Sequence, residues 1–217
     1  MLISGLLIFI NWAVWIYAVT SNQVINASFG YFIMPIISIF LGYFFFKEKL
    51  SFKGKISVSI VVISILFLII IDFKSLPWVG LIVAFSWSFY NLLRKKINVE
   101  TDLGLLIESL FILPFVVVAF YFIVQNNVND FDISNPPLMF ILMLAGPMTV
   151  IPLFLYVRGV EYCGLGPSGM IFYITPTLQF ILGYYLYNET LNINKFVSFF
   201  LIWIAVFIYL KDLYENN

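Results

Sequence analysis

The chain has 217 residues, of which 63% are hydrophobic and only 10% are charged, and its mean hydropathy is +1.05. This composition excludes a soluble globular domain, whose core cannot bury that much apolar surface. The 11 basic and 11 acidic residues cancel, so no electrostatic footprint indicates a nucleic-acid partner. Histidine is absent and Cys163 is the only cysteine, which excludes an intramolecular disulfide, a Cys/His metal site and an imidazole base.

Apolar runs separated by polar or Gly/Pro clusters predict eight helices. In chain order they are 2–19, 27–46, 56–71, 77–93, 103–124, 138–157, 166–187 and 196–210. Membrane-spanning strands would alternate polar and apolar residues, whereas these runs are apolar on every face. We therefore predict an all-α integral membrane protein, a polytopic helical bundle whose solvent is the lipid bilayer.

Basic residues fall unevenly between the two sides of the membrane. Nine of the 11 lie on the side that also holds both ends of the chain: Lys47, Lys49, Lys53, Lys55, Arg94, Lys95, Lys96, Arg158 and Lys211. By the positive-inside rule this side is cytoplasmic. We therefore expect cytoplasmic N- and C-termini.

The sequence matches itself at an offset of 141 residues. Within the 24-residue window 27–50, seven residues recur 141 positions later. The pairs are Ile33 and Ile174, Pro35 and Pro176, Leu41 and Leu182, Gly42 and Gly183, Tyr43 and Tyr184, Glu48 and Glu189, and Leu50 and Leu191. Corresponding helices are five apart in chain order, an odd number, so the two copies have opposite orientations. The lysines of loop 47–53 are absent from 188–194, as inversion predicts.

This inverted repeat predicts two domains. Residues 1–75 would hold the last three helices of a truncated first repeat, and residues 76–217 a complete five-helix second repeat. We expect a full-length relative to have about two more helices, giving about ten in total.

Several stretches resemble the RarD branch of the EamA family, in the drug/metabolite transporter superfamily. They are Asn11-Trp12, Ala27 to Ile33 leading to Pro35, Ser75-Leu76-Pro77, Tyr90 to Lys96, Leu106-Ile107-Glu108 and Pro176-Thr177-Leu178. The resemblance implies an inverted-repeat secondary carrier in the bacterial inner membrane, with cytoplasmic ends. It leaves the transported substrate, direction, coupling ion and oligomeric state open.

Polar residues inside a span are candidates for transport because they are costly there. Glu108 would bind a cationic cargo or carry a coupling proton, unless it only reaches the interface or a neighbouring helix. Asn11, beside Trp12, and Gln179 lie near the middle of their helices, where an amide binds a polar solute or joins two helices.

Aromatic residues and prolines supply the other candidates. Tyr31 and Tyr173 flank the repeat-related prolines and suit an amphiphilic or aromatic cargo, although ordinary packing explains them too. Pro35 and Pro176 are hinge candidates, because a proline removes a backbone hydrogen bond and bends a helix. Prolines are also common in membrane helices without function.

The run 164–169 satisfies the pattern G-x-G-x-x-G. No strand precedes it, so we reject a dinucleotide site and predict no cofactor. We also predict no catalytic residue and no metal site.

The favoured function is a permease or exporter of small organic solutes, working by alternating access. The alternative is a truncated or noncatalytic membrane subunit that needs a complementing chain or a homo-oligomer to complete the bundle. A membrane enzyme would show clustered carboxylates or histidines, and a channel would show a ring of like charges. Neither feature is present in the sequence.

Overall fold

The computed structural model describes residues 1–21, 24–72, 78–97, 99–126, 129, 131, 133–178 and 193–216, and the regular elements in these ranges are helical. The helices are α1 (Leu2–Thr20), α2 (Val24–Phe46), α3 (Phe52–Asp72), α4 (Trp78–Lys96), α5 (Thr101–Gln125), α6 (Pro136–Cys163), α7 (Leu165–Ile171) and α9 (Ile193–Asn216). Five of them, α1, α3, α5, α6 and α9, hold stretches long and apolar enough to cross a membrane. The predicted class of a polytopic helical membrane protein is confirmed.

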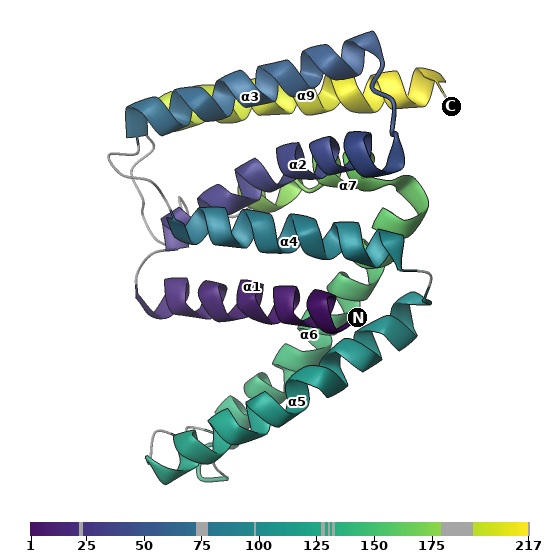
Figure 1. Ribbon diagram of the computed structural model, residues 1–217. Helices are drawn as coiled ribbons and strands as arrows, with labels where there is room; N and C mark the ends of the chain where they lie inside the picture. Colours follow the sequence, from purple (N-terminus) through teal and green to yellow (C-terminus); the bar gives the residue numbers. More distant parts are fainter. Residues whose placement is uncertain are drawn as a thin grey trace.

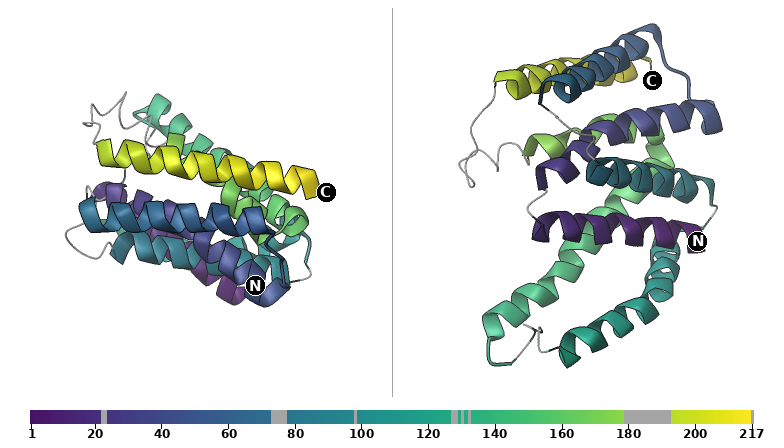
Figure 2. Two further views of the ribbon diagram at one scale, coloured as in Figure 1. Left: turned by 90° about the horizontal axis from the view of Figure 1, so that it is seen from above. Right: turned by 60° about the vertical axis from the view of Figure 1, so that its left-hand side comes forward.

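Neighbouring helices in space are often distant in sequence (Figure 1). α3 lies beside α9, α2 packs against α4, and α1 covers the other side of α4. The short α7 packs against α2. Figure 2 shows the same layers from two other directions. Both ends of the chain lie at the same end of the bundle, which is the right-hand side in Figure 1.

The predicted 141-residue repeat pairs α2 with α7 and α3 with α9. These repeat-related helices pack against each other. Where α2 meets the end of α7, the Tyr173 hydroxyl donates to the carbonyl of Phe32, and these two residues are also 141 apart. Contacts between equivalent residues are expected where a pseudo-two-fold axis passes between two copies.

The seventh predicted span is interrupted. α7 ends before Phe172, and helical backbone resumes over 174–178 after a two-residue turn. Pro176 explains the break, because it has no N–H to donate to the carbonyl of Phe172 four residues earlier. The backbone N–H of Thr175 donates to that carbonyl instead, at 2.9 Å. The remainder of this predicted span, residues 179–187, lies outside the described ranges.

A close crossing joins α2 to α4. A Cβ atom added at Gly30 would lie 2.3 Å from the carbonyl oxygen of Gly80, so the two backbones meet with no side chain between them. Small residues allow membrane helices to approach in this way. The crossing brings the neighbouring Tyr31 against the bundle interior, where the residue is half-buried.

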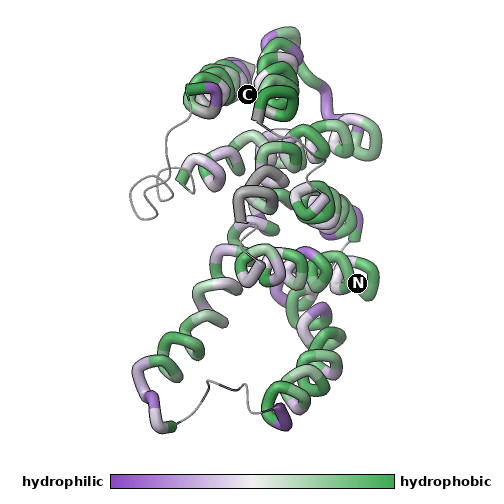
Figure 3. Tube along the Cα trace, turned by 90° about the vertical axis from the view of Figure 1, so that its left-hand side faces the viewer, coloured by the Kyte–Doolittle hydropathy of each residue, from purple (hydrophilic) through white to green (hydrophobic). Residues whose placement is uncertain are grey.

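The hairpin of α5 and α6 diverges from the remaining helices (Figures 1 and 3). Within the described residues, only 11% of the apolar window of α5 and 6% of that of α6 are buried, against 35% for α9. Figure 3 shows that both helices are largely hydrophobic along their length. Such surfaces are stable against hydrocarbon or against other apolar helices.

Candidate functional site

Five aromatic side chains meet inside the bundle, and we call them the aromatic cluster: Trp15, Tyr31, Trp87, Tyr156 and Phe172. They come from α1, α2, α4, α6 and the turn after α7. Trp87 and Tyr156 both pack on Phe172, with ring centroids 6.0 and 5.2 Å away, and Tyr31 does so at 5.7 Å. Trp15 continues the row beyond Tyr31 at 5.4 Å. All five residues are half-buried.

An amide lies beside the aromatic cluster. Asn91 is fully buried in α4, and its Nδ2 donates to the hydroxyl of Tyr156 at 3.2 Å. Its Oδ1 has no hydrogen-bond partner within the described part of the chain. A buried acceptor without a donor is costly, so a donor from a solute or water is expected there.

The side chains of the neighbouring candidates Asn11 and Trp12 lie in different surroundings. Asn11 is buried, and its Nδ2 donates to the carbonyl of Val83 and to the hydroxyl of Ser86, each at 2.9 Å. It therefore joins α1 to α4. Trp12 is 37% exposed on the outer surface and makes no contact with the aromatic cluster among the described ring pairs. Trp15, one turn later, takes the inward position.

The predicted tyrosines also occupy different environments. Tyr31 belongs to the aromatic cluster, with Trp15 on one side and Phe172 on the other. Tyr173 is only 1% exposed and hydrogen-bonds to the backbone of α2, so it holds α2 against the end of α7. Gln179 lies outside the described residues.

The hinge candidates Pro35 and Pro176 lie on repeat-related segments that approach each other. A Cβ atom at Gly169 of α7 would lie 3.3 Å from the Cα of Pro35, so the two backbones are in close contact there. Pro176 follows the turn that interrupts the seventh span. Each proline follows a residue of the aromatic cluster by four positions, Pro35 after Tyr31 and Pro176 after Phe172.

Glu108 is buried among three helices. Its Oε1 accepts from the hydroxyl of Ser4 at 2.6 Å and its Oε2 accepts from the hydroxyl of Tyr90 at 3.2 Å. The Nη1 of Arg94 lies 3.9 Å from Oε1. The carboxylate thus connects α5 to α1 and α4, and its oxygens face protein groups in this structure.

Arg94 forms the centre of what we call the buried ion cluster, which consists of Arg94, Glu108 and Glu161. The Arg94 side chain is 0% exposed, and its Nη2 lies 3.4 Å from Glu161 and donates to the carbonyl of Thr101 at 3.2 Å. The hydroxyl of Thr101 hydrogen-bonds to Glu161. A buried guanidinium needs such partners, because an unpaired buried charge is strongly destabilising.

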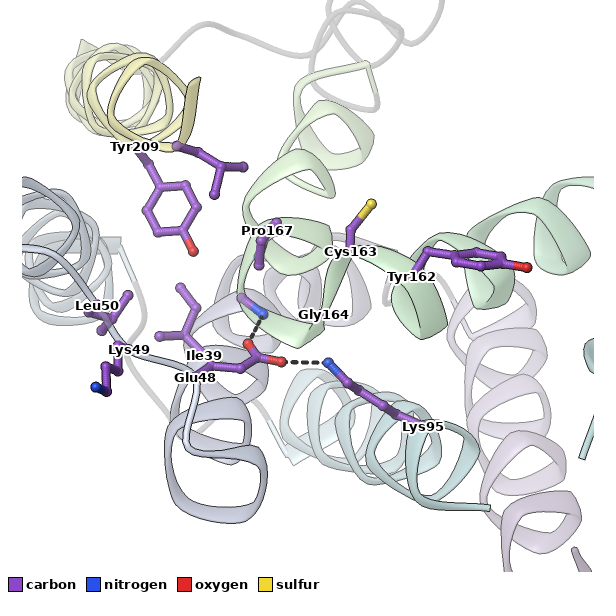
Figure 4. A pocket seen from close by; sticks show the side chains of 12 residues that line it. Ile39, Glu48, Lys49, Leu50, Lys95, Tyr162, Cys163, Gly164, Pro167 and Tyr209 are labelled. Carbon is purple, nitrogen blue, oxygen red and sulfur yellow. Dashed lines mark hydrogen bonds and ion pairs between the residues drawn. The ribbon is translucent and has the colours of Figure 1, made fainter. Parts of the chain in front are cut away.

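A pocket of about 290 Å³ opens where the ends of α2, α4, α6 and α9 meet (Figure 4). Glu48, in the loop after α2, points into it toward Lys95 and the backbone at the start of α7. Cys163 and Tyr209 line other parts of its wall. Among the described residues, no group of three or more His, Cys, Asp or Glu side chains has the arrangement of a metal site.

The sequence pattern of the EamA-like transporter family matches residues 1–70 and 75–211. The chain belongs to this family. Protein RarD of Salmonella typhi is 35% identical over 210 residues, which cover 97% of this chain and 71% of the relative. The uncharacterized transporter YojE of Bacillus subtilis is 32% identical over 207 residues, 95% of this chain and 68% of the relative. The chloramphenicol-sensitive protein RarD of Pseudomonas aeruginosa is 22% identical over 204 residues, 94% and 67% of the two chains.

Membership of the EamA-like family confirms the resemblance drawn from the sequence, including its RarD branch. It also establishes the coarse function, a membrane transporter, and therefore the lipid bilayer as the surroundings of the chain.

Sequence reasoning missed most of the residues that build this transporter's interior. Aromatic residues make up 20% of the chain, so composition does not distinguish Trp87 or Phe172 from lipid-facing rings. Arg94 directly precedes Lys95 and Lys96, so in the sequence it is indistinguishable from a charge that only sets orientation. Glu48 did carry a signal, because it is one of the identical residues in the repeat.

Proposed function

We propose that this chain is a secondary carrier of small organic solutes that works by alternating access between its inverted repeats. The aromatic cluster is the observation that carries the proposal. Its rings come from α1 and α2 of the first repeat and from α4, α6 and the turn after α7 in the second. Relative motion of the two repeats would therefore change the shape of this site, as alternating access requires.

The side chains of the site favour an aromatic or amphiphilic cargo without a strong charge. Rings supply the walls, and the Asn91 oxygen supplies a hydrogen-bond acceptor. The charged groups at the site's cytoplasmic side pair with each other, as Arg94 does with Glu161 and Glu108. We assign Glu108 to holding α1, α4 and α5 together. The coupling ion stays open.

We also propose a bacterial inner-membrane location with both termini in the cytoplasm. Seven of the 11 basic residues lie either between the end of α2 and the first turn of α3 or in the last turn of α4. The ion pair between Lys95 and Glu48 joins these two segments at one end of the bundle. Both chain ends lie at that end too (Figure 1). Positive residues are retained on the cytoplasmic side of a membrane.

The name of the Pseudomonas relative includes chloramphenicol, and binding of this compound tests the proposed class of cargo. We expect Trp87→Ala to weaken binding of radiolabelled chloramphenicol to the purified protein about tenfold, because the indole that packs on both Tyr156 and Phe172 is lost. Trp12→Ala is the matched control, since it removes the same side chain from the outer surface and should leave binding unchanged. Equal affinity of both variants would contradict the proposed site.

The exposed hairpin favours a second candidate, a membrane subunit completed by another chain or copy. Little of α5 and α6 is buried within the described chain. Native mass spectrometry of the protein extracted in lipid discs distinguishes the two cases. A single chain that binds chloramphenicol supports the carrier, whereas binding only by a larger assembly supports the subunit.

A further inference from the structure

The loop after α2 directs a carboxylate back over the end of that helix. Lys47 adopts a left-handed conformation, with φ of 55°, which ends the helix. The backbone N–H of Glu48 then donates to the carbonyl of Gly42 at 3.1 Å, which fixes the reversal. Glu48 is therefore held in place by its own backbone.

The Glu48 carboxylate binds two elements of the second repeat. Its Oε1 accepts from the backbone N–H of Leu165 at 2.9 Å, and its Oε2 accepts from that of Gly166 at 2.9 Å. Lys95 of α4 donates to Oε1 at 2.7 Å, and its Nζ also lies 4.8 Å from the ring centre of Phe46 (Figure 4). Charge-assisted bonds of this kind are roughly twice as strong as neutral ones.

Glycines make room for this carboxylate on three sides. A Cβ atom at Gly42 would lie 2.5 Å from the Glu48 carboxylate, one at Gly164 would lie 2.8 Å away and one at Gly166 would lie 3.3 Å away. Gly164 also has a φ of +98°, which other residues rarely adopt. The run 164–169, which matches the dinucleotide pattern, therefore contacts the Glu48 carboxylate of the other predicted repeat.

Below this contact, α2 and α7 are tightly packed toward the aromatic cluster. Leu41 and Leu165 share one core cluster, and Ser38 is 1% exposed. A Cβ at Gly169 would lie 3.3 Å from the Cβ of Ser38. α2 and α7 are therefore in direct contact below Glu48.

We propose that Glu48 is the latch of the cytoplasmic gate, and this inference rests on the proposed carrier function. The latch is closed in this structure, and opening separates the start of α7 from Glu48. The adjoining pocket of about 290 Å³ gives water access to the carboxylate, whose side chain is 23% exposed. Because Lys95 stays beside it, the released charge keeps a partner in both states.

The test is the accessibility of a cysteine placed below the latch. In the full chain with Cys163→Ser, the substitution Ser38→Cys creates a single reporter thiol at a buried position of α2. Its rate of alkylation by N-ethylmaleimide in lipid vesicles measures how often α2 and α7 separate. We expect Glu48→Gln to raise this rate about tenfold, because the latch loses its charge while keeping its shape.

Two further variants complete the test. Glu215→Gln removes an exposed ion pair with Lys53 at the same end of the bundle and should leave the rate unchanged. Lys95→Gln removes the cation but keeps both backbone bonds to Glu48, so a smaller increase is expected. If Glu48→Gln does not fold, the alkylation rate of Lys95→Gln tests the latch by itself.

An alkylation rate that stays at the parent value in both latch variants would overturn the gate. The assay contains no solute, so a failure of chloramphenicol binding would count against the proposed carrier site and leave the latch result unaffected.

Discussion

Gly104→Ala is expected to destabilise the protein by about 3 kcal/mol or more, one of the two largest effects that this structure predicts. A Cβ atom at Gly104 would lie 1.7 Å from Nη1 of Arg94 and 2.6 Å from its Cζ. The guanidinium is 0% exposed and pairs with Glu161 and Glu108, so a shift that makes room for the methyl group moves it away from these partners. Moving it would leave two carboxylates without their cation.

Thermal unfolding in detergent, followed by circular dichroism, measures this effect as a fall in the apparent Tm. Gly159→Ala is the matched control, because a Cβ at Gly159 would meet no heavy atom within 4 Å. An alanine in a helix interior is usually favoured over glycine by about 0.5–1 kcal/mol, so this control should be neutral or slightly stabilising. Equal Tm values for Gly104→Ala and the parent would contradict the placement of Arg94.

Arg94→Gln is expected to destabilise by about 3–5 kcal/mol, since it breaks the buried ion cluster from its centre. Glu108 and Glu161 then lose their shared cation in an interior position. Adding Glu108→Gln should restore part of the loss, because removing both members of a buried pair is less costly than removing one.

A double-mutant cycle of unfolding measurements isolates this coupling. The account predicts that the double variant is more stable than Arg94→Gln alone. A double variant that is less stable by the full effect of Glu108→Gln would mean that the two side chains do not interact. Glu108 would then be free for a role in coupling.

The positions of most helices could be predicted from the sequence because apolar runs are local signals. The repeat of 141 residues stays a prediction, which rests on pairs such as Glu48 and Glu189. The break before Pro176 follows from the sequence as well, because a proline has no N–H for the carbonyl of Phe172, four residues earlier.

The site was harder to predict because these helices are apolar on every side, so the sequence does not show which face is buried. Trp12 and Trp15 are similar in sequence, yet only Trp15 reaches the aromatic cluster. Glu108 was found because a carboxylate inside a span is rare. Its partner Arg94 belongs to a basic run at a helix end. In the sequence, a buried arginine there cannot be distinguished from an ordinary surface charge.

Counterflow of radiolabelled chloramphenicol in proteoliposomes tests the carrier proposal most directly. Vesicles loaded with unlabelled compound should transiently accumulate label when they contain the parent protein or Trp12→Ala, and should fail to do so with Trp87→Ala. Transport by alternating access through the aromatic cluster requires this pattern. Accumulation with Trp87→Ala that equals the parent, or none with the parent above empty vesicles, would contradict the account.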